Sequence, residues 1–539
     1  MSDNIFIVLK DVVKNHPDRE AMVSYNIDLN RQALTFKQFW TLSARCAAWL
    51  RGVGMKRHDN VLVTVPMSLE YFVICFGIMM AGGAVVPMKK LSAHGKAVAE
   101  TVRLCETAFV FLKADGEDST YDLLRPDIKI EKQAGIQIGS VTRSDMPQLT
   151  TAILVQRETS GSVKGFLDFL GSLSEEYVDM GLRPTDASCF VLTMDVKKLW
   201  CYKHCEVSHR ELLSLKEFWA KKFPNFDSFY FAYPWYGAIG VPYDTLCGGT
   251  RIMPDLWDTE DLNSTQVKIV AANKVKNAMM PPHDVMQAQE ALKDKQGPFL
   301  DTIIIGGGML VSESVEPFKK FAKNVIISYM NSEAVYVTML QLEKDKKFEN
   351  YDAGFPIDGV ELMVLDKHHQ PVRTGQVGEI AIKSKTMFTR YYGDPEMTRK
   401  VWAKDGWYLT SDAGYLRPDG RLFVFGRQGD VISRGVIIFT PAMIEKPISN
   451  HPDVLEVRVV PIPDPVNGQN SCACVVKRAE SGLNPNDIKD LAEGSMSEFG
   501  KYLFTLDHVL IFENSIAKKS KEELISIACS QLGVVPPKF

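Results

Sequence analysis

The sequence predicts an α/β fold that is divided into more than one domain. Along most of the chain, apolar periodicity alternates between short strand-like runs and stretches with helical spacing, an order typical of α/β proteins. The chain has 539 residues, a length at which more than one domain is expected. A hydrophobic content of 45% with 24% charged residues is ordinary for a globular protein with a large core.

The first predicted elements follow this alternation in order. Residues 36–50 repeat apolar side chains at helical spacing and predict a helix, and residues 60–66 form an apolar run typical of a buried strand. Residues 70–80 predict a second helix, which the small-residue turn at 81–83 ends. Residues 84–87 then predict the next buried strand.

Composition excludes several function classes. The net charge is −4 and no long basic run occurs, which disfavours nucleic-acid binding. Ten dispersed cysteines favour reduced thiols over a disulfide framework. No run reaches about 18 apolar residues, the length needed to span a membrane. The acidic start at 1–4 is unlike a signal peptide and the last residues are not S-K-L, so we expect a cytoplasmic protein.

One segment near the C-terminal end carries the most specific pattern. It reads D-G-W-Y-L-T-S-D at 405–412, D-G-R-L at 419–422 and G-R at 426–427. This pattern closely resembles the W-Y-x-T-G-D-L…D-G…G-R signature of the adenylate-forming, or AMP-binding, superfamily. The resemblance implies that Asp412 accepts hydrogen bonds from the ribose of a nucleotide and that Arg427 supports this contact. Read alone, Asp412 is a surface carboxylate beside a turn.

Further motifs in matching order extend the resemblance over most of the chain. P-A-M-I-E at 441–445, H-P-D-V at 451–454 and A-C-V-V at 473–476 resemble the family's small second domain. The resemblance therefore implies the adenylate-forming enzyme fold, with a large multi-subdomain α/β N-terminal domain over 1–427 and a small α+β C-terminal cap domain over 428–539. Five residues nearer the N-terminal end fall on family positions: Gly54, Asp59, Pro66, Gly82 and Pro87.

The segment S-Y-M-N-S-E at 328–333 follows an apolar strand and matches the family pattern Y-G-x-T-E. The resemblance implies that Tyr329 lies against adenine, that Ser332 bonds the α-phosphate and that Glu333 ligates Mg²⁺ with a hard oxygen. Met330 replaces the family glycine and brings a side chain where backbone normally approaches the ligand. Without the resemblance, the segment is an ordinary strand-to-loop exit.

Three glycines at 306–308 resemble the family's S-G-G loop at the acyl pocket, and we place Gly307 among the nucleotide-binding residues. Read alone, they indicate only a tight backbone turn. The pocket histidine of the family aligns with Gly237, and the hinge position between the domains is Gly429, which leaves a swivel permitted.

The phosphate-binding loop is the main departure from the family. T-S-G-S-V-K-G at 159–165 looks like a shortened version of the loop. However, the motif S-H-R-E-L-L, which should follow the loop directly, lies more than forty residues downstream at 208–213. Counting back from Ser208 instead places the loop at 193–203, beginning at Thr193 and containing no glycine.

This loss predicts impaired or altered chemistry. A phosphate cradle presents consecutive backbone N–H groups, and glycine permits that approach. Losing one preorganised donor typically costs on the order of 10²–10³ in rate, and Asp195 adds repulsion. Lys197, Lys198 or Lys203 is placed to compensate in part as a point charge.

The C-terminal lysine of the family, which stabilises the adenylation transition state, falls in a stretch that lacks the family's proline and glycine. Counting back from Leu524 favours Lys518, while Lys519 and Lys521 remain alternatives. A solvated lysine cluster at the start of a terminal helix explains the same residues.

A loose C-x₃-C-x₃-H spacing occurs at Cys201, Cys205 and His209, with His204 nearby. Because a well-spaced fourth ligand is missing, a metal site at these residues is disfavoured. The sequence contains no G-x-S-x-G elbow, the motif that would indicate a hydrolase. It also contains no G-x-G-x-x-G after a strand, the motif that would indicate a dehydrogenase.

We therefore expect a protein resembling acyl-CoA synthetases, which activates a carboxylic acid, with fatty acids the favoured class, to an acyl-adenylate and transfers it to CoA. Its cofactors are ATP and Mg²⁺, with CoA as a substrate. The alternatives are a catalytically inactive protein that retains nucleotide, acyl or partner binding, and a different chemistry on the same fold. The predicted catalytic residues are Lys518 and Glu333, and the predicted nucleotide-binding residues are Asp412, Arg427, Tyr329, Ser332, Gly307 and Thr193.

Overall fold

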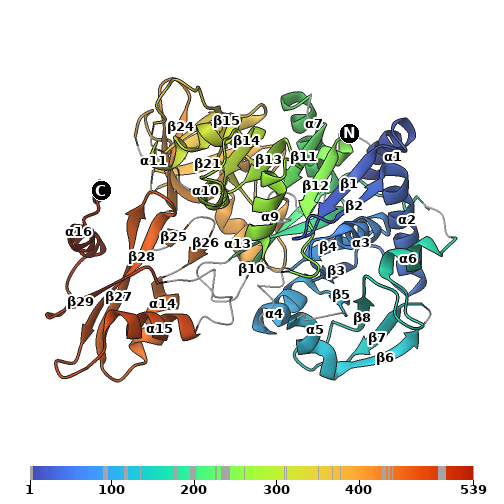
Figure 1. The fold of residues 1–539 in the computed structure, drawn as a ribbon, viewed down its shortest axis with the longest axis horizontal. Coiled ribbons are helices and arrows are strands. Elements are labelled where there is room, and N and C mark those ends of the chain that lie inside the picture. Colours follow the sequence, from blue (N-terminus) through green and yellow to red (C-terminus); the bar gives the residue numbers. More distant parts are fainter. Residues whose placement is uncertain are drawn as a thin grey trace.

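The structure is a computed structural model. It describes residues 4–88, 95–114, 119–133, 135–174, 179–194, 202–224, 227–231, 243–259, 261–308, 310, 312–349, 351–366, 368–376, 378–427, 432–434, 437–439, 441–495 and 506–537. Figure 1 shows two large sheets side by side, with a smaller C-terminal domain at their left. The predicted α/β architecture with a small second domain is confirmed.

The first sheet, called here the large sheet, has thirteen strands and changes character along its width. Except for the edge strand β2 (Arg31–Thr35), which pairs antiparallel with its neighbour, one half is parallel, so that the carboxyl ends of its strands meet at one edge. From β18 (Thr338–Gln341) onward the pairs are antiparallel. In spatial order its strands are β2 (Arg31–Thr35), β1 (Glu20–Tyr25), β12 (Thr250–Pro254), β11 (Ser228–Phe231), β13 (Asn277–Met280), β14 (Leu300–Gly306), β15 (Ala322–Ser328), β18 (Thr338–Gln341), β19 (Asp352–Pro356), β24 (Leu422–Arg427), β23 (Tyr408–Leu416), β21 (Gly378–Ser384) and β20 (Val360–Leu365).

The second sheet has nine strands and is built mostly from the sequence between the strands of the large sheet. Its strands in spatial order are β22 (Arg390–Tyr391), β10 (Tyr202–Ser208), β9 (Ala187–Met194), β4 (Ala84–Pro87), β3 (Asn60–Val63), β5 (Phe109–Lys113), β8 (Thr151–Val155), β7 (Gln137–Val141) and β6 (Ile128–Gln133). A separate two-stranded hairpin joins β16 (Met330–Asn331) to β17 (Val335–Tyr336).

Two helices predicted from the sequence occupy the layer next to these sheets. α2 (Phe36–Gly52) begins at Thr35, whose hydroxyl accepts a hydrogen bond from the Gln38 N–H, while the Gln38 side chain accepts one from the Thr35 N–H. Every residue of α3 (Leu69–Met80) is buried, as expected of a helix that is apolar on all sides. β3 and β4 form where the two strands were predicted, although β3 ends at Val63, earlier than expected.

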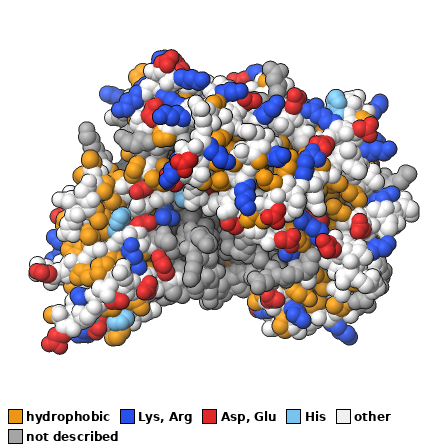
Figure 2. All heavy atoms as spheres, in the orientation of Figure 1, with side chains coloured by type: hydrophobic (Ala, Val, Ile, Leu, Met, Phe, Trp, Pro, Cys, Tyr) orange, Lys and Arg blue, Asp and Glu red, His pale blue; other side chains and the backbone are white. Residues whose placement is uncertain are grey.

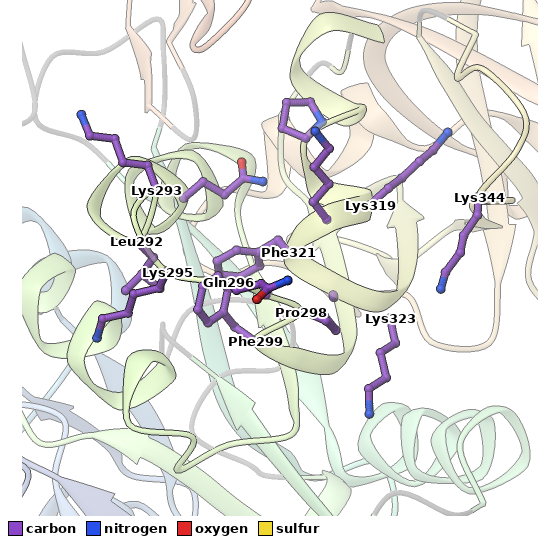
Figure 3. A pocket seen from close by; sticks show the side chains of 15 residues that line it. Leu292, Lys293, Lys295, Gln296, Pro298, Phe299, Lys319, Phe321, Lys323 and Lys344 are labelled. Carbon is purple, nitrogen blue, oxygen red and sulfur yellow. The ribbon is translucent and has the colours of Figure 1, made fainter.

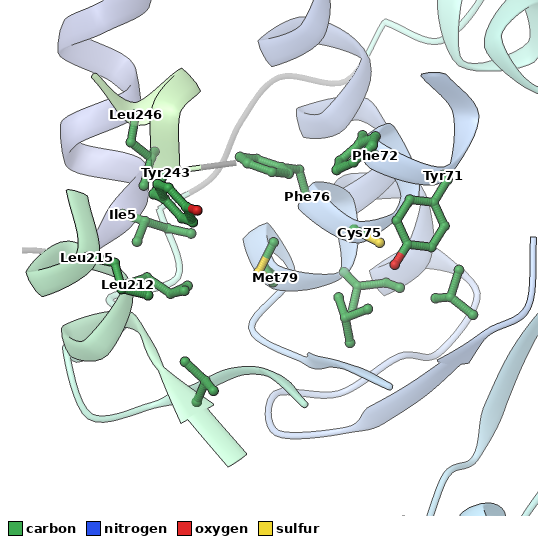
Figure 4. Close-up of a cluster of buried hydrophobic side chains, with 14 of the residues drawn as sticks. Ile5, Tyr71, Phe72, Cys75, Phe76, Met79, Leu212, Leu215, Tyr243 and Leu246 are labelled. Atoms are coloured by element: carbon green, nitrogen blue, oxygen red, sulfur yellow. The ribbon is translucent and has the colours of Figure 1, made fainter. Parts of the chain in front are cut away.

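The main core lies between the two sheets. Figure 4 shows Phe76 and Met79 of α3 directed toward Leu212 and Tyr243, while Tyr71 points to the opposite side. The remaining helices cover the outer faces or connect the strands. They are α1 (Ile5–Asn15), α4 (Gly95–Cys105), α5 (Ser119–Leu124), α6 (Phe166–Gly171), α7 (His209–Lys222), α8 (Tyr243–Leu246), α9 (Leu262–Ala271), α10 (Pro282–Ala291), α11 (Ser312–Val315), α12 (Phe318–Phe321) and α13 (Pro395–Val401), with short 3₁₀ turns at Arg125–Asp127 and Lys404–Gly406.

The C-terminal domain is a small α+β unit with a core on each face of its sheet. One core packs the sheet against α14 (Pro441–Ser449) and α15 (Pro485–Ser495), and the other packs it against α16 (Lys521–Leu532). The expected boundary after residue 427 stays a prediction, since residues 428–431 lie outside the described chain. The strands of this domain are β25 (Ile432–Arg434), β26 (Ile437–Phe439), β27 (Val454–Asp464), β28 (Gly468–Lys477) and β29 (His508–Phe512).

A buried charge cluster connects the two large sheets. The guanidinium of Arg157, which follows β8, lies 3.1 Å from Glu70 of α3 and 3.0 Å from Asp255, which follows β12. Its carbon Cζ lies 4.8 Å from the ring centre of Trp257, and the ammonium of Lys113 lies 5.4 Å from the same centre. The cluster therefore joins the ends of strands that belong to different sheets.

The surface carries charges of both signs. Figure 2 shows Lys and Arg side chains interspersed with Asp and Glu over the upper part of the viewed face, and hydrophobic side chains on the C-terminal lobe at the left. No helix in the described part of the chain combines the length and apolar character needed to cross a membrane.

Candidate functional site

The centre of the candidate site is a contact between two residues that are distant in sequence. Tyr329 follows β15 directly, at the carboxyl edge of the parallel half of the large sheet. Its hydroxyl donates a hydrogen bond to Oδ2 of Asp412, which lies in β23 and is 6% exposed. The Thr410 hydroxyl, in turn, accepts a hydrogen bond of 2.9 Å from the Asp412 N–H. The structure thus brings together two of the residues predicted to bind a nucleotide.

A backbone irregularity sets the direction of Asp412. The register between β21 and β23 shifts in this region, and Ser411 adopts φ +58, in the left-handed region that L-residues disfavour. The Ser411 N–H donates a hydrogen bond of 2.9 Å to Oε1 of Glu379. The family motif has glycine at this position, and the positive φ gives a physical reason for that preference, since serine adopts it here only under strain.

Arg427 ends β24, and its backbone lies opposite Asp412 in the β23–β24 pairing. The position of this backbone agrees with the predicted supporting role. The side chain of Arg427 lies outside the described atoms, so this role stays a prediction.

Glu333 forms the second part of the site. Its side chain is 2% exposed, and its Oε1 accepts a hydrogen bond of 2.6 Å from the Tyr391 hydroxyl. Burial, and then the charge of Glu333, raise the pKa of Tyr391, so this hydroxyl remains protonated and acts as a donor. Ser332 lies half-buried just before Glu333, in the turn between β16 and β17.

The donor chemistry at Glu333 fits Mg²⁺. This ion prefers hard oxygen ligands and is often bound by one or two carboxylates together with phosphate oxygens and water. Within the described ranges, no group of three or more His, Cys, Asp or Glu side chains is arranged to hold a metal by itself. A single carboxylate that shares the ion with a nucleotide is the arrangement these residues support.

The described members of the disfavoured cysteine and histidine set belong to no group of three or more possible ligands. Cys205, His204 and His209 are buried, and Cys201 lies outside the described chain. Burial lowers the pKa of His204 and of His209 to about 4, so both imidazoles are neutral near pH 7.

Met330 occupies space beside the glycine run. Gly306 ends β14, and a Cβ added to it would lie 3.0 Å from the terminal methyl of Met330 and 2.5 Å from the carbonyl oxygen of Ser328. Gly307, which follows, is exposed and has φ +92. The side chain that replaces the family glycine therefore lies against the first residue of the predicted acyl-pocket loop.

The predicted phosphate-binding loop at 193–203, which lacks the family's glycines and is called here the rewritten loop, joins β9 to β10. Thr193 lies in β9 with its backbone opposite Lys203, and residues 195–201 lie outside the described chain. The pairing of β10 with β22 puts Cys205 opposite Tyr391, and the Lys203 ammonium lies 5.3 Å from the centre of the Tyr391 ring. Both strands of the hairpin thus lead toward the Glu333 side of the site.

The other glycine-containing stretch, 159–165, has a local structural role. The Thr159 hydroxyl accepts a hydrogen bond of 3.0 Å from the Gly165 N–H and lies 3.2 Å from a carboxylate oxygen of Asp168 in α6. A bridge between Ser160 and Val163 closes the turn. The described contacts of this stretch tie it to α6 rather than to Asp412 or Glu333.

Lys518 is not brought to the other residues in this arrangement. It is exposed and lies between β29 and α16, and Figure 1 shows α16 on the side of the C-terminal domain that faces away from the large sheets. The backbone around it is fixed, because the Ile516 N–H donates to Glu456 and the Lys519 carbonyl accepts from Arg458. Gly237 and Gly429, two further sequence predictions, lie outside the described residues.

A groove of about 570 Å³ lies at the opposite, amino-terminal ends of β14 and β15. Its floor contains Pro298, Phe299 and Phe321, and Figure 3 shows the lysines around it pointing in different directions. Three of its lysines pair with carboxylates outside the groove, Lys293 with Glu290, Lys319 with Glu316 and Lys323 with Asp301. These cations do not converge on a common ligand position.

Tyr391 is a site residue that the sequence reasoning missed. It belongs to none of the motifs used, and a tyrosine between Arg390 and Tyr392 carries no local pattern that points to a site. Only the long-range pairing of β22 with β10 shows that its hydroxyl reaches Glu333.

The chain matches two protein-family models. The model described as AMP-binding enzyme matches residues 9–171 and 202–392, which is more than half of the chain. The model described as AMP-binding enzyme C-terminal domain matches residues 443–522. The first match is interrupted at 172–201, and the predicted phosphate-binding loop begins within this interval.

Individual relatives agree with these models. The chain is 23% identical over 517 residues to a 4-coumarate–CoA ligase-like protein of Arabidopsis thaliana, covering 93% of this chain and 89% of that one. It is 35% identical over 144 residues to a sulfoacetate–CoA ligase of Cupriavidus necator, covering 27% of this chain and 28% of that ligase. Two of the curated relatives are matched over less than half of their lengths, 46% and 28%.

A solved structure shows the same fold. A fatty acyl-CoA synthetase of Mycobacterium tuberculosis superposes with a TM-score of 0.65 at 20% identity, covering 99% of both chains. The extent of the family-model match, together with the order of the motifs around Tyr329, Glu333 and Asp412, leads to one conclusion: the chain belongs to the AMP-binding, or adenylate-forming, enzyme family.

Proposed function

We propose that this protein binds ATP and Mg²⁺, activates a carboxylic acid to an acyl-adenylate and transfers the acyl group to CoA. The observation that carries the proposal is the hydrogen bond from Tyr329 to Asp412 with Glu333 four residues after Tyr329, at the carboxyl edge of the large sheet. Relatives whose names describe CoA ligases support this reaction class.

Each residue has a distinct task in this proposal. Asp412 accepts hydrogen bonds from the ribose, with Arg427 beside it, and Tyr329 supplies the ring against which adenine lies. The hydroxyl of Ser332 donates to the α-phosphate as the carboxylate of the acid attacks phosphorus and pyrophosphate leaves. Glu333 holds the ion, and bound Mg²⁺ supplies positive charge that offsets the charge on the phosphates.

Lys518 takes part only after a movement of the C-terminal domain. We infer that the domain swivels about Gly429, which permits the change in backbone angles, and carries the lysine toward the nucleotide. In the present arrangement the exposed Lys518 makes no described contact with Asp412 or Glu333.

We further propose a fatty acid as substrate, a reduced rate and a cytoplasmic location. The likeness to a fatty acyl-CoA synthetase supports the acid class. The glycine-free loop and the position of Met330 against Gly306 support the reduced rate. The eight cysteines whose side chains the structure describes are free thiols, most of them buried, which supports a reducing compartment.

A second function, nucleotide or acyl binding without catalysis, is favoured by one observation. The family match is interrupted over residues 172–201, the interval in which the predicted phosphate-binding loop begins, and resumes at residue 202. Such a protein keeps the contact between Tyr329 and Asp412 but lacks the cradle for the β- and γ-phosphates.

Two measurements separate these functions. ATP–pyrophosphate exchange with Mg²⁺ and pooled short-, medium- and long-chain and aryl acids should exceed background, and splitting the pool identifies the acid class. AMP binding by calorimetry should weaken in Asp412→Ala at unchanged melting temperature, with Asp366→Ala, at an exposed turn, as the matched control. AMP binding without any exchange would favour the binding protein, and unchanged affinity in Asp412→Ala would refute the ribose assignment.

A further inference from the structure

The carboxylate of Glu333 lies in an environment that restricts its orientation. Both Glu333 and Tyr391 are 2% exposed, and the hydroxyl of Tyr391 lies 2.6 Å from Oε1 of the carboxylate. The Phe388 N–H donates a hydrogen bond of 2.7 Å to the Glu333 carbonyl oxygen, which ties the backbone of the acid to the same segment that carries Tyr391. The acid and the hydroxyl are therefore connected through both main chain and side chain.

The ring of Tyr391 is itself held from several directions. Phe388 packs against it with ring centres 4.8 Å apart, and the Lys203 ammonium lies 5.3 Å from its centre. Its backbone N–H donates to the Thr398 hydroxyl at 3.1 Å, and its strand pairs with β10. The Tyr408 hydroxyl lies 3.3 Å from the Tyr391 hydroxyl. A ring packed in this way presents its O–H in one direction.

We propose that Tyr391 is a positioning residue, which holds the Glu333 carboxylate by Oε1 and thereby orients the rest of the group toward Mg²⁺ bound with a nucleotide. This inference rests on the proposed function, because it takes Glu333 to be the metal ligand. Groups that hold a ligand side chain through a hydrogen bond typically change metal affinity by about 10- to 100-fold when they are removed.

The strand pairing gives this role a second consequence. Lys203 stands in β10 at the end of the rewritten loop, and it contacts Tyr391 rather than Glu333 itself. Tyr391 thus lies between the loop strand and the metal ligand. The hydrogen bond to the carboxylate therefore comes from β22 of the second sheet, while the ribose contact proposed for Asp412 belongs to the large sheet.

The test compares Tyr391→Phe with Tyr392→Phe, the same substitution at the adjacent half-buried tyrosine. Binding of ATP is measured by calorimetry with Mg²⁺ and with EDTA, and AMP binding is measured in EDTA. Tyr391→Phe should weaken ATP binding about 10- to 100-fold in Mg²⁺ and leave AMP binding in EDTA unchanged, because Asp412 sets the latter. Tyr392→Phe should retain the wild-type values.

The outcomes separate this inference from the proposed function. If the wild type binds AMP through Asp412 but Tyr391→Phe keeps the full effect of Mg²⁺, the positioning role is refuted while the nucleotide site stands. If the wild type binds ATP equally with and without Mg²⁺, both the metal site and this inference fail. Should Tyr391→Phe not fold, Tyr408→Phe tests the next hydroxyl: it should reduce the effect of Mg²⁺ by a smaller factor, and an unchanged effect contradicts the proposal.

Discussion

Ser411 adopts the backbone conformation that orients Asp412 in the candidate site. The bulge that aims Asp412 into the sheet edge needs φ near +58, and glycine reaches such a conformation without the steric cost that a side chain brings. The sequence motif indicated that a glycine was expected there. Only the structure explains why, since a positive φ cannot be derived from the identity of the residue that is present.

Replacing Ser411 by glycine should stabilise the protein. Relief of the left-handed strain, less the added flexibility of glycine in the unfolded chain, should raise the free energy of unfolding by about 0.5 to 1 kcal/mol. Denaturant titration measures this change. Ser411→Ala keeps the Cβ and should show no gain, so an equal gain in both variants would mean that strain is not the cause.

Met330 offers a test of crowding at the nucleotide site. Its terminal methyl lies against Gly306, in the position where the family has no side chain. Met330→Gly should therefore increase AMP affinity several-fold, at a cost in stability of about 1 kcal/mol for glycine. Met330→Leu retains the volume and should leave the affinity unchanged. Weaker AMP binding in Met330→Gly would show that the thioether contacts the ligand favourably.

Among the candidate site residues, the sequence predicted those that belong to contiguous motifs. Tyr329 and Asp412 were predicted separately, and the structure joins them by a hydrogen bond. Tyr391 escaped prediction, because its contact with Glu333 depends on a pairing of strands that are far apart in the chain. Chemistry that arises from tertiary contact alone leaves no local pattern to read.

At the scale of elements, periodicity succeeded where packing is simple. Apolar spacing indicated α2 and α3, because a helix that buries one face, or all faces, must repeat its apolar residues. Apolar spacing does not predict the order of the strands in a sheet. β22, with two residues, is too short to carry a pattern, yet it covers the edge of the second sheet next to β10.

The charge cluster between the sheets leads to a stability prediction. Arg157→Met leaves the buried carboxylates of Glu70 and Asp255 without their guanidinium and should cost about 3 to 5 kcal/mol of unfolding free energy. Arg19→Met breaks an exposed pair with Asp227 and should cost less than about 1 kcal/mol. Equal losses in the two variants would mean that the buried cluster contributes no more than a surface pair.

The same variant should respond to pH in a defined direction. Burial raises the pKa of Asp255, whereas Arg157 acts to lower it. A carboxyl with a raised pKa in the folded state binds protons more readily folded than unfolded, so lower pH favours the fold. The loss in Arg157→Met should therefore be smaller at pH 5 than at pH 7.5, measured by denaturant unfolding at both values.

For the molecule as a whole, two buried imidazoles predict sensitivity to acid. Burial lowers the pKa values of His204 and His209 to about 4 in the folded protein, from an ordinary value of about 6.5 for an exposed imidazole. The unfolded chain therefore binds protons first, and the stability present above pH 6.5 is lost as the pH falls toward 4. Each histidine should cost about 2 kcal/mol between pH 7 and 5. His209→Gln should remove about half of the combined loss of stability from the two buried histidines. The substitution His16→Gln, at an exposed position, should leave the combined loss unchanged.

The two-domain architecture was predictable from the sequence because many ordered motifs support it jointly. The arrangement of the domains was not, since Lys518 is placed by the orientation of the whole C-terminal domain rather than by its own surroundings. A lysine that acts only after a rotation has no fixed neighbours that a pattern could encode.

The interleaving of the two sheets has a consequence for synthesis on the ribosome. β1 lies between β2 and β12, and its partner residues in β12 are Arg251 to Pro254. The hairpin of β1 and β2 is made first, but its inner edge has no partner until more than two hundred further residues have been translated. At about 5 to 20 residues per second this interval lasts roughly 10 to 50 s. During that time the nascent chain presents an unpaired apolar edge, which makes the early stage of translation the period in which a chaperone is of most use.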